Sequence, residues 1–198
     1  MTTRLIVPHR GLASAKTRLS PVLDAGERTA LAGRLLSGVL RAAREAVEDV
    51  VVISPAAVLE PLVAEAGARL VVQRGMGLNQ GLEQAREAAL ADGVALLGVL
   101  HGDLPNLTAG DVQALLAAAE QGRSVAIAPD RAGSGTNGLA LRPPDIIGFR
   151  FGPGSLAAHR EEALAAGIEP VVVERDGLAF DLDTPQDLAR WLELGSAA

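Results

Sequence analysis

The chain has 198 residues, 48% of them apolar, and a formal net charge of −6, which suits a single folded domain over residues 1–198 rather than a disordered chain. Aromatic residues make up only 2%, so neither a stacking platform for single-stranded nucleic acid nor an aromatic-anchored protein interface is expected. The acidic charge also opposes binding to a phosphate backbone, and no apolar run approaches the roughly 20 residues of a membrane span. We therefore expect no nucleic acid partner and no membrane partner.

Short apolar runs alternate along the chain with longer stretches of helical period. Strands are predicted at 3–7, 49–53, 68–72, 94–100, 124–128 and 170–174, and helices at 24–47, 56–66, 80–91, 109–121, 155–166 and 185–194. Strands of continuous Val, Ile and Leu are typical of a parallel sheet that is covered on both faces. We predict an α/β fold with a doubly wound, mostly parallel sheet flanked by helices. No strand is predicted in the glycine- and proline-dense stretch 133–154.

The chain has no cysteine, which excludes disulfides, thiol nucleophiles and Cys-ligated metals, so any metal must be held by oxygen or His. The first ten residues combine a short apolar run, which stops at Pro8, with a charged flank. This pattern is unlike a signal peptide. We expect a cytoplasmic protein.

Loop 8–19 follows the first predicted strand, where ligands bind in open parallel sheets. It carries Arg10, Lys16 and Arg18, and Lys16 is the single lysine among 18 basic residues. One compact ammonium and two Arg forks can hold a triphosphate, although a solvated basic loop is the alternative. Because every other basic residue counted here is arginine, the lysine at position 16 favours a functional role for Lys16. For Arg10 and Arg18 the two interpretations stay balanced.

Asp103 comes directly after the predicted strand 94–100. A carboxylate at the carboxyl end of a strand is well placed for Mg²⁺, which prefers one or two carboxylates together with substrate phosphates. The alternative is that Asp103 caps the next helix. Thr108 and Asp111, three residues apart, already supply that capping signal, which leaves Asp103 free for function.

Asp181 and Asp183 lie in the stretch FDLDTP. If this stretch is extended, both carboxylates share one face and repel each other unless a cation lies between them, while Leu182 points into the core. The alternative is that Asp183 or Thr184 caps the helix that begins at Pro185. Together with Asp103, the two residues would form a three-carboxylate site for one or two Mg²⁺ ions.

Two glycine-rich stretches, GSGTNG at 133–138 and FGPGS at 151–155, expose backbone N–H groups that can bind phosphate or carboxylate. Surface turns without function look the same. Thr136, Asn137 and Ser155 add short polar side chains to these turns and favour binding. His159, one helical turn after Ser155, either reaches the same anion or is a plain exposed helix residue.

Six short motifs occur in a recognisable order. They are A-K-T-R-L at 15–19, G-L-N at 77–79, G-D-L-P at 102–105, P-D-R-x-G-x-G-T-N at 129–137, F-G-P-G-S at 151–155 and D-x-D-T-P at 181–185. In this order and spacing the chain resembles the 2-phospho-L-lactate guanylyltransferase family, including its phosphoenolpyruvate guanylyltransferase members, which make the guanylylated precursor of coenzyme F-420. The resemblance covers nearly the whole chain and implies a Rossmann-like nucleotidyltransferase fold.

The resemblance also implies roles for individual residues. The implied Mg²⁺ ligands are Asp103, Asp181 and Asp183, and the implied catalytic residues are Lys16 and Asp103. The implied nucleotide-binding residues are Pro8, Arg10, Gly11, Lys16, Arg18, Gly77 and Asn79. The implied acceptor-binding residues are Thr136, Gly152 and Ser155. Family members usually carry a lysine at the position of Arg10, so the phosphate contact there differs although its positive charge survives.

The reaction that the resemblance implies is a direct transfer of GMP. A phosphate oxygen of a phosphorylated three-carbon acid attacks the α-phosphorus of GTP and pyrophosphate leaves, with no nucleophile from the enzyme. Phospholactate, phosphoenolpyruvate and 3-phosphoglycerate all stay open as the acid. The alternatives are another nucleotidyltransferase of the same fold, using CTP or a sugar- or molybdopterin-type acceptor, and a non-catalytic nucleotide-binding domain. The family would also suggest a homodimer, for which the sequence shows no interface signature.

Overall fold

A computed structural model describes the backbone of residues 2–196 and the side chains of residues 2–193. Its strands are β1 (Thr3–Pro8), β2 (Asp49–Ser54), β3 (Arg69–Val72), β4 (Leu96–Leu100), β5 (Ser124–Pro129), β6 (Thr136–Arg142) and β7 (Val171–Val172). Its α-helices are α1 (Ala25–Ala46), α2 (Glu60–Glu65), α3 (Leu78–Ala91), α4 (Ala109–Ala117), α5 (Ser155–Ala165), α6 (Asp176–Ala179) and α7 (Pro185–Ser196). Two short 3-10 helices, η1 (Thr17–Leu19) and η2 (Ala57–Leu59), precede α1 and α2.

The seven strands form one sheet in the order β3-β2-β1-β4-β6-β5-β7. Every neighbouring pair is parallel except the two pairs that involve β6, which runs antiparallel to β4 and β5. The predicted doubly wound, mostly parallel sheet is therefore confirmed. The chain leaves β1 for β2 on one side and later returns to β4 on the other, so the strand order reverses between β1 and β4. Ligands bind at such switch points, beyond the carboxyl ends of the strands.

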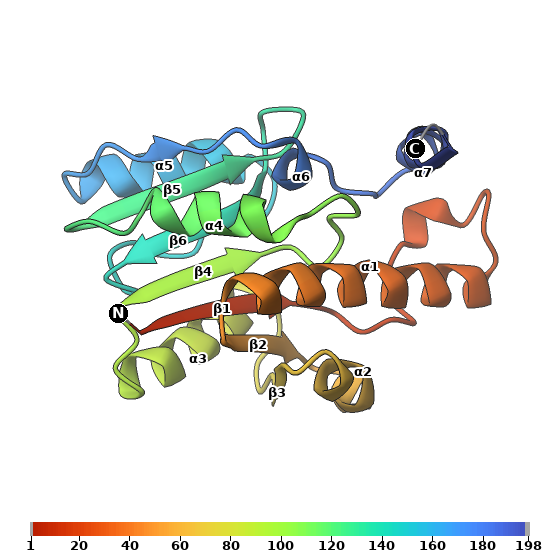
Figure 1. The fold of residues 1–198 in the computed structure, drawn as a ribbon, viewed down its shortest axis with the longest axis horizontal. Coiled ribbons are helices and arrows are strands. Elements are labelled where there is room, and N and C mark those ends of the chain that lie inside the picture. Colours follow the sequence, from red (N-terminus) through yellow and green to blue (C-terminus); the bar gives the residue numbers. More distant parts are fainter. Residues whose placement is uncertain (1, 197–198) are drawn as a thin grey trace.

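Helices cover both faces of the sheet, as the ribbon shows (Figure 1). Alternate residues of each strand enter different cores: Leu5 and Val7 pack with α1, α2 and α4, whereas Ile6 packs with α3 and α5. All three side chains are fully buried. Because both faces are covered, each buried strand needs apolar residues at every position, which explains the continuous Val, Ile and Leu runs.

A third apolar cluster lies beyond the carboxyl edge of the sheet. Leu19 of η1 packs with Leu31 and Leu35 of α1 and with Leu182, and Trp191 of α7 covers them. Figure 1 shows α7 and the loop before α1 at the edge where β1 and β4 end. This cluster packs the loop after β1 and the segment before α7 against α1 at that edge.

The predicted elements differ from the observed ones mainly after residue 130. The stretch 133–154, expected to carry no strand, contains β6. Its pattern is obscured by Gly138, which packs so closely that an added Cβ would lie 2.8 Å from Cδ2 of Leu115 on α4. The strand expected at 170–174 is only Val171–Val172, and the short helix α6 lies in a segment expected to be a loop.

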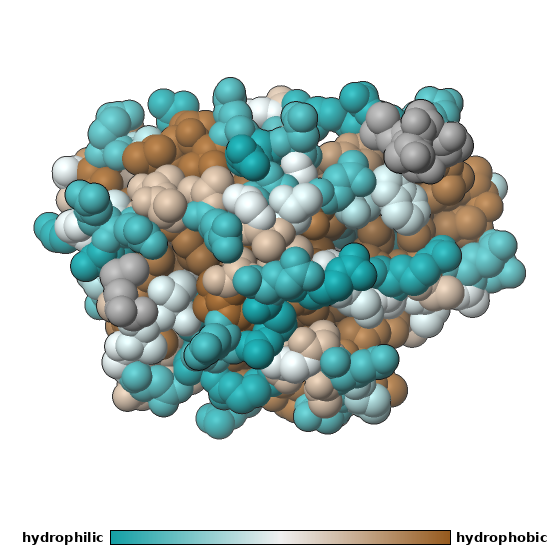
Figure 2. All heavy atoms as spheres, in the orientation of Figure 1, coloured by the Kyte–Doolittle hydropathy of each residue, from teal (hydrophilic) through white to brown (hydrophobic). Residues whose placement is uncertain are grey.

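The helix ends follow the expected capping chemistry. Thr108 accepts a hydrogen bond from the backbone N–H of Asp111, and the Asp111 carboxylate accepts one from the backbone N–H of Thr108, which confirms the predicted capping box. α1 begins with an equivalent box formed by Asp24 and Glu27. The solvent side of α1 is a band of hydrophilic residues in Figure 2.

Within residues 2–196 no helix combines the length and apolar character that crossing a membrane requires.

The close approach of β1 and α4 to β4 makes Gly98 a sensitive position. An added Cβ would lie 3.1 Å from Cδ2 of Leu116 and still closer to Cδ2 of Leu5. We expect Gly98→Ala to lower the free energy of unfolding by about 1–3 kcal/mol because overpacking displaces the neighbours. The matched control, Gly38→Ala in α1, meets nothing within 4 Å and should raise it by about 0.5–1 kcal/mol. Urea denaturation measures both, and equal effects would contradict this packing.

Candidate active site

The carboxyl ends of β1 and β4 meet the beginning of β6 at one edge of the sheet. Because β6 is antiparallel to β4, its first residues lie beside the last residues of β4, and the backbone N–H of His101 donates to the carbonyl of Asn137 at 3.0 Å. The loop after β1, the loop after β4 and the start of β6 therefore surround one region. This region contains most of the residues that the sequence singled out.

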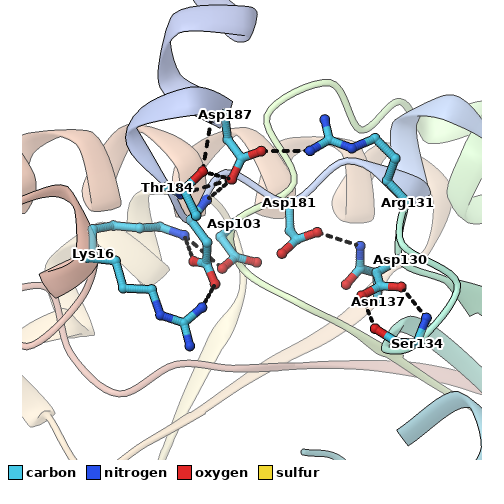
Figure 3. A network of polar contacts seen from close by, with 11 residues as sticks. Lys16, Asp103, Asp130, Arg131, Ser134, Asn137, Asp181, Thr184 and Asp187 are labelled. Carbon is cyan, nitrogen blue, oxygen red and sulfur yellow. Dashed lines mark hydrogen bonds and ion pairs between the residues drawn. The ribbon is translucent and has the colours of Figure 1, made fainter. Parts of the chain in front are cut away.

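Lys16 extends its side chain into this region toward Asp103 (Figure 3). Its backbone is left-handed, with φ 56° and ψ 33°, and no other non-glycine residue in the described part of the chain has a positive φ. Its side chain is only 4% exposed, and Nζ lies 2.8 Å from Oδ2 of Asp103 and 3.0 Å from Oδ1 of Asp183. A sparsely populated backbone conformation of this kind persists only where surrounding contacts hold it. Here two ion pairs do so.

The two ion pairs set the charge states of Lys16 and Asp103. Burial opposes the charge on Lys16, but Asp103 and Asp183 outweigh it and raise the pKa of the ammonium above its ordinary value. Burial likewise opposes the charge on Asp103, but Lys16 outweighs it, with help from His101, and lowers the pKa of the carboxyl. Oδ1 of Asp103 is buried and has no hydrogen-bond partner. The site thus holds an ionised carboxylate with one oxygen still available.

The segment 180–184 brings two more carboxylates to Asp103. The backbone N–H of Leu182 donates to the carbonyl of Asp103 at 3.2 Å, and the Leu182 side chain is fully buried. This confirms that Leu182 points into the core. Burial raises the pKa of Asp181, and the nearby negative charges of Asp103 and Asp183 raise it further, although Asn137 donates a hydrogen bond to Asp181 at 3.3 Å.

The helix after this segment is capped by Thr184 rather than by Asp183. Oγ1 of Thr184 accepts from the backbone N–H of Asp187 at 3.2 Å, and the Asp187 carboxylate accepts from the backbone N–H of Thr184 at 2.9 Å. Asp183 is therefore free to pair with Lys16. Sequence reasoning missed Asp187, which also pairs with Arg131 at 2.8 Å. The spacing of Thr184 and Asp187, three residues apart at the start of α7, is a capping-box pattern that could have revealed this role.

Whether Asp103, Asp181 and Asp183 hold Mg²⁺ stays a prediction. As the side chains lie, the described residues contain no group of three His, Asp or Glu placed to hold a metal ion. Nζ of Lys16 pairs with both Asp103 and Asp183. The chemistry of the donors nevertheless fits a hard cation: all are carboxylate oxygens, and one is buried without a partner. Burial, followed by the negative charge of Asp103, raises the pKa of Asp181, which a cation would offset.

The predicted acceptor residues lie at the start of β6 and of α5. Thr136 and Ser155 are buried, and Gly152 has φ 136°, a conformation that side chains rarely adopt. Oγ1 of Thr136 lies 3.0 Å from Nδ1 of His159. His159 is fully buried, so the interpretation as an exposed helix residue is wrong.

Asn79 connects α3 to the turn before α5. Its Nδ2 donates to the carbonyl of Phe151 at 3.0 Å, and its Oδ1 accepts from the backbone N–H of Phe151 at 3.0 Å. The Asn79 amide therefore already holds the turn at residues 151–154, which we call the acceptor turn after the role predicted for Gly152. Its contact with a nucleotide stays a prediction. Gly77, with φ 99°, lies just before α3.

The remaining predicted nucleotide residues surround the end of β1. Pro8 ends that strand, and the backbone N–H of Gly11 donates to Nδ1 of His9 at 3.0 Å. Arg18 is 74% exposed and lies 3.7 Å from Asp183. Arg10 is exposed, and its side chain makes no hydrogen bond or ion pair with the described residues. The structure thus gathers Lys16 with the aspartates, places the exposed Arg18 at the edge of this group through Asp183, and leaves Arg10 in solvent.

The fold is shared with several solved structures. The chain is similar to a putative nucleotide-diphospho-sugar transferase from Desulfovibrio desulfuricans, with a TM-score of 0.83 and 21% identity over 98% of this chain and 88% of that one. It is also similar to 2-C-methyl-D-erythritol 4-phosphate cytidylyltransferase from Thermus thermophilus, with a TM-score of 0.64 and 20% identity over 99% of this chain and 100% of that one. At these identities the likeness shows the fold alone, which is the Rossmann-type fold of nucleotidyltransferases.

The sequence relatives define the family within this class. The family model described as "Guanylyl transferase CofC like" matches residues 3–197. A phosphoenolpyruvate guanylyltransferase from Rubrobacter xylanophilus is 46% identical over 96% of this chain and 93% of that protein. A 3-phospho-D-glycerate guanylyltransferase from Phenylobacterium zucineum is 39% identical over 92% of this chain and 86% of that protein. The chain belongs to the CofC-like guanylyltransferase family, which confirms the resemblance seen in its motifs.

The buried ring of His159 makes acid sensitivity a test of this site. Burial lowers the pKa of His159 to about 4; Glu162 opposes this, and Arg150 and His101 add to it. Between about pH 6.5 and 4 the unfolded chain binds the extra proton, so stability is complete above about pH 6.5 and falls as the pH falls toward 4. The loss from this group is about 3 kcal/mol.

Denaturant unfolding at a series of pH values between 7.5 and 4 measures this slope. The variant His159→Phe should flatten it, although His9, whose pKa burial also lowers, leaves part of it in place. An unchanged slope in His159→Phe would show that His159 already titrates normally in the folded protein.

Proposed function

We propose that this chain transfers GMP from GTP to the phosphate of a phosphorylated three-carbon acid, in coenzyme F-420 biosynthesis, with Mg²⁺ as cofactor. The observation that carries the proposal is the buried ammonium of Lys16, held between Asp103 and Asp183 at the switch point of a nucleotidyltransferase fold. The relative from Rubrobacter xylanophilus supports phosphoenolpyruvate as the acid. The relative from Phenylobacterium zucineum keeps 3-phosphoglycerate open, and the motif resemblance keeps 2-phospho-L-lactate open.

The chemistry needs positioning more than acid–base help. An ionised phosphate oxygen of the acid attacks the α-phosphorus of GTP, the bond from that phosphorus to the bridging oxygen breaks, and pyrophosphate leaves with the bonding pair. No proton has to move, so the site needs no general base. Holding the two anions in line and neutralising their charge supplies the catalysis.

Lys16 and Asp103 are the residues to which we assign catalysis. Phosphate oxygens of GTP would compete with Asp103 and Asp183 for the ammonium, and Lys16 would then stabilise the charge that builds on the α-phosphate and the leaving group. This exchange would free the carboxylates of Asp103, Asp181 and Asp183 to hold Mg²⁺, which supplies charge neutralisation and orients the phosphates. A compact ammonium suits this exchange better than a planar guanidinium.

The two substrates would lie on either side of Lys16. On the nucleotide side we assign the contacts to the loop after β1 and to the start of α3, through Pro8, Arg10, Gly11, Arg18, Gly77 and Asn79. On the acceptor side we assign them to Thr136, Gly152 and Ser155. A cytoplasmic location and a homodimer stay predictions, the first from the sequence and the second from the family.

Pyrophosphate release tests the function directly. The protein is assayed with each of the four nucleoside triphosphates, with and without Mg²⁺, against phosphoenolpyruvate, 2-phospho-L-lactate and 3-phosphoglycerate in competition. We expect release only with GTP, Mg²⁺ and an acid, and the highest kcat/KM with phosphoenolpyruvate. Release with CTP alone would indicate a cytidylyltransferase, and no release with any acid would favour a non-catalytic nucleotide-binding domain.

Replacing Asp103 tests its assigned role. Asp103→Asn should reduce kcat by about 100-fold or more because it removes a charge that acts where the phosphates meet the cation. The matched control is Asp145→Asn, an exposed aspartate outside the six motifs, which should keep normal turnover. Thermal unfolding checks that both variants are folded. Near-normal turnover of a folded Asp103→Asn variant would refute the assignment.

A further inference from the structure

The tautomer of His159 is fixed by its surroundings. Nε2 accepts a hydrogen bond from the backbone N–H of Arg150 at 3.0 Å. A backbone amide only donates, so Nε2 presents a lone pair and carries no proton. Burial keeps the ring neutral by lowering its pKa to about 4. In a neutral imidazole the proton must then be on Nδ1.

The Nδ1 proton determines whether the Thr136 hydroxyl donates to His159 or accepts from it. Oγ1 of Thr136 lies 3.0 Å from Nδ1, so the threonine oxygen faces an N–H group and can only accept from it. The hydroxyl proton of Thr136 must therefore point elsewhere.

That hydroxyl proton has no acceptor among the described residues. Thr136 is 2% exposed, and its one side-chain hydrogen bond within the described part of the chain is the contact with His159. A buried donor without an acceptor costs about 1–3 kcal/mol, so buried donors are normally satisfied by a ligand or water when the protein supplies nothing. This free donor, the Thr136 hydroxyl, lies at the start of β6. The next residue, Asn137, contacts Asp181, and the His159 partner of Thr136 belongs to α5.

The ring itself is held firmly. Phe151 packs edge-on against it, with ring centroids 4.8 Å apart and an interplanar angle of 72°. Asn79 clamps the backbone of that same Phe151. His159 therefore contacts β6 through Thr136, and the acceptor turn through Arg150 and Phe151. One buried ring thus links the two segments to which we assign the acceptor.

We propose that His159 is a positioning residue for the acceptor, which acts by making Thr136 an obligate hydrogen-bond donor toward an anionic oxygen. The inference rests on the proposed function and deepens it. A carboxylate or phosphate oxygen only accepts hydrogen bonds and is therefore favoured by this donor. His159 does not contact the substrate; it works through the threonine.

Steady-state kinetics of a double-mutant cycle test this mechanism, with KM for phosphoenolpyruvate, KM for GTP and kcat measured separately. Thr136→Val removes the donor and should raise the KM for phosphoenolpyruvate roughly 10- to 100-fold, the effect of a hydrogen bond to a charged group. His159→Phe should raise the same KM, and His159→Asn, whose amide can donate near the Nδ1 position, should restore part of it. The KM for GTP should stay within about two-fold.

The cycle distinguishes positioning from a merely structural role. If His159 acts through Thr136, His159→Phe adds less than about two-fold to the KM for phosphoenolpyruvate when Thr136 is already Val. Effects that multiply, or an unchanged KM in folded His159→Phe, overturn the inference. Glu161→Gln, an exposed position on α5, is the matched control, and thermal unfolding identifies variants that fail to fold.

A measurement without turnover separates this inference from the proposed function. The chain has three histidines, so the ring nitrogens of His159 can be assigned by ¹⁵N–¹H NMR. We expect the Nδ1-protonated neutral tautomer from pH 5.5 to 8, and a shift of the Nδ1 resonance when phosphoenolpyruvate is added. An Nε2-protonated ring or an imidazolium at pH 7 refutes the inference. Absence of guanylyl transfer with every acid would refute the proposed function while leaving the tautomer result standing.

Discussion

The ion pairs of Lys16 with Asp103 and Asp183 organise the whole ligand edge of the protein. Burying an ammonium costs several kcal/mol unless charges and hydrogen bonds compensate it, and two carboxylates from distant segments do so here. The same pairs bring the loop after β1, the end of β4 and the segment before α7 together. The apolar cluster around Leu19 and Leu182 packs the first and the last of these segments against α1. The charge arrangement and the packing therefore support each other.

Much of this could be predicted from the sequence, because the determining signals are local. Strands buried on both faces appear in the sequence as uninterrupted aliphatic runs. The Thr108–Asp111 pair correctly predicts the start of α4. The alternation in FDLD correctly placed Leu182 inside. Lys16 was conspicuous as the single lysine. In each case the residue type and its immediate neighbours already contain the physical cause.

What the sequence did not reveal depends on partners far along the chain. β6 was missed because its glycine, which is unfavourable in a strand by itself, is required by the side chain of Leu115. The burial of His159 depends on Arg150 and on Thr136, which lies 23 residues away. The clamp from Asn79 to Phe151 spans 72 residues. No local pattern encodes such contacts, so Asn79 could be noticed in a motif without its role being understood.

The clamp between Asn79 and Phe151 has a consequence for how this enzyme can change. Both of its hydrogen bonds end on main-chain atoms, so the asparagine holds the position of the turn without reading which side chain residue 151 carries. Substitutions within the turn can then alter side-chain size and polarity where we assign the acid, while its backbone path is retained. A scaffold of this kind lets new acceptor preferences arise by single replacements, and the guanylyltransferases for different three-carbon acids that resemble this chain fit such a history.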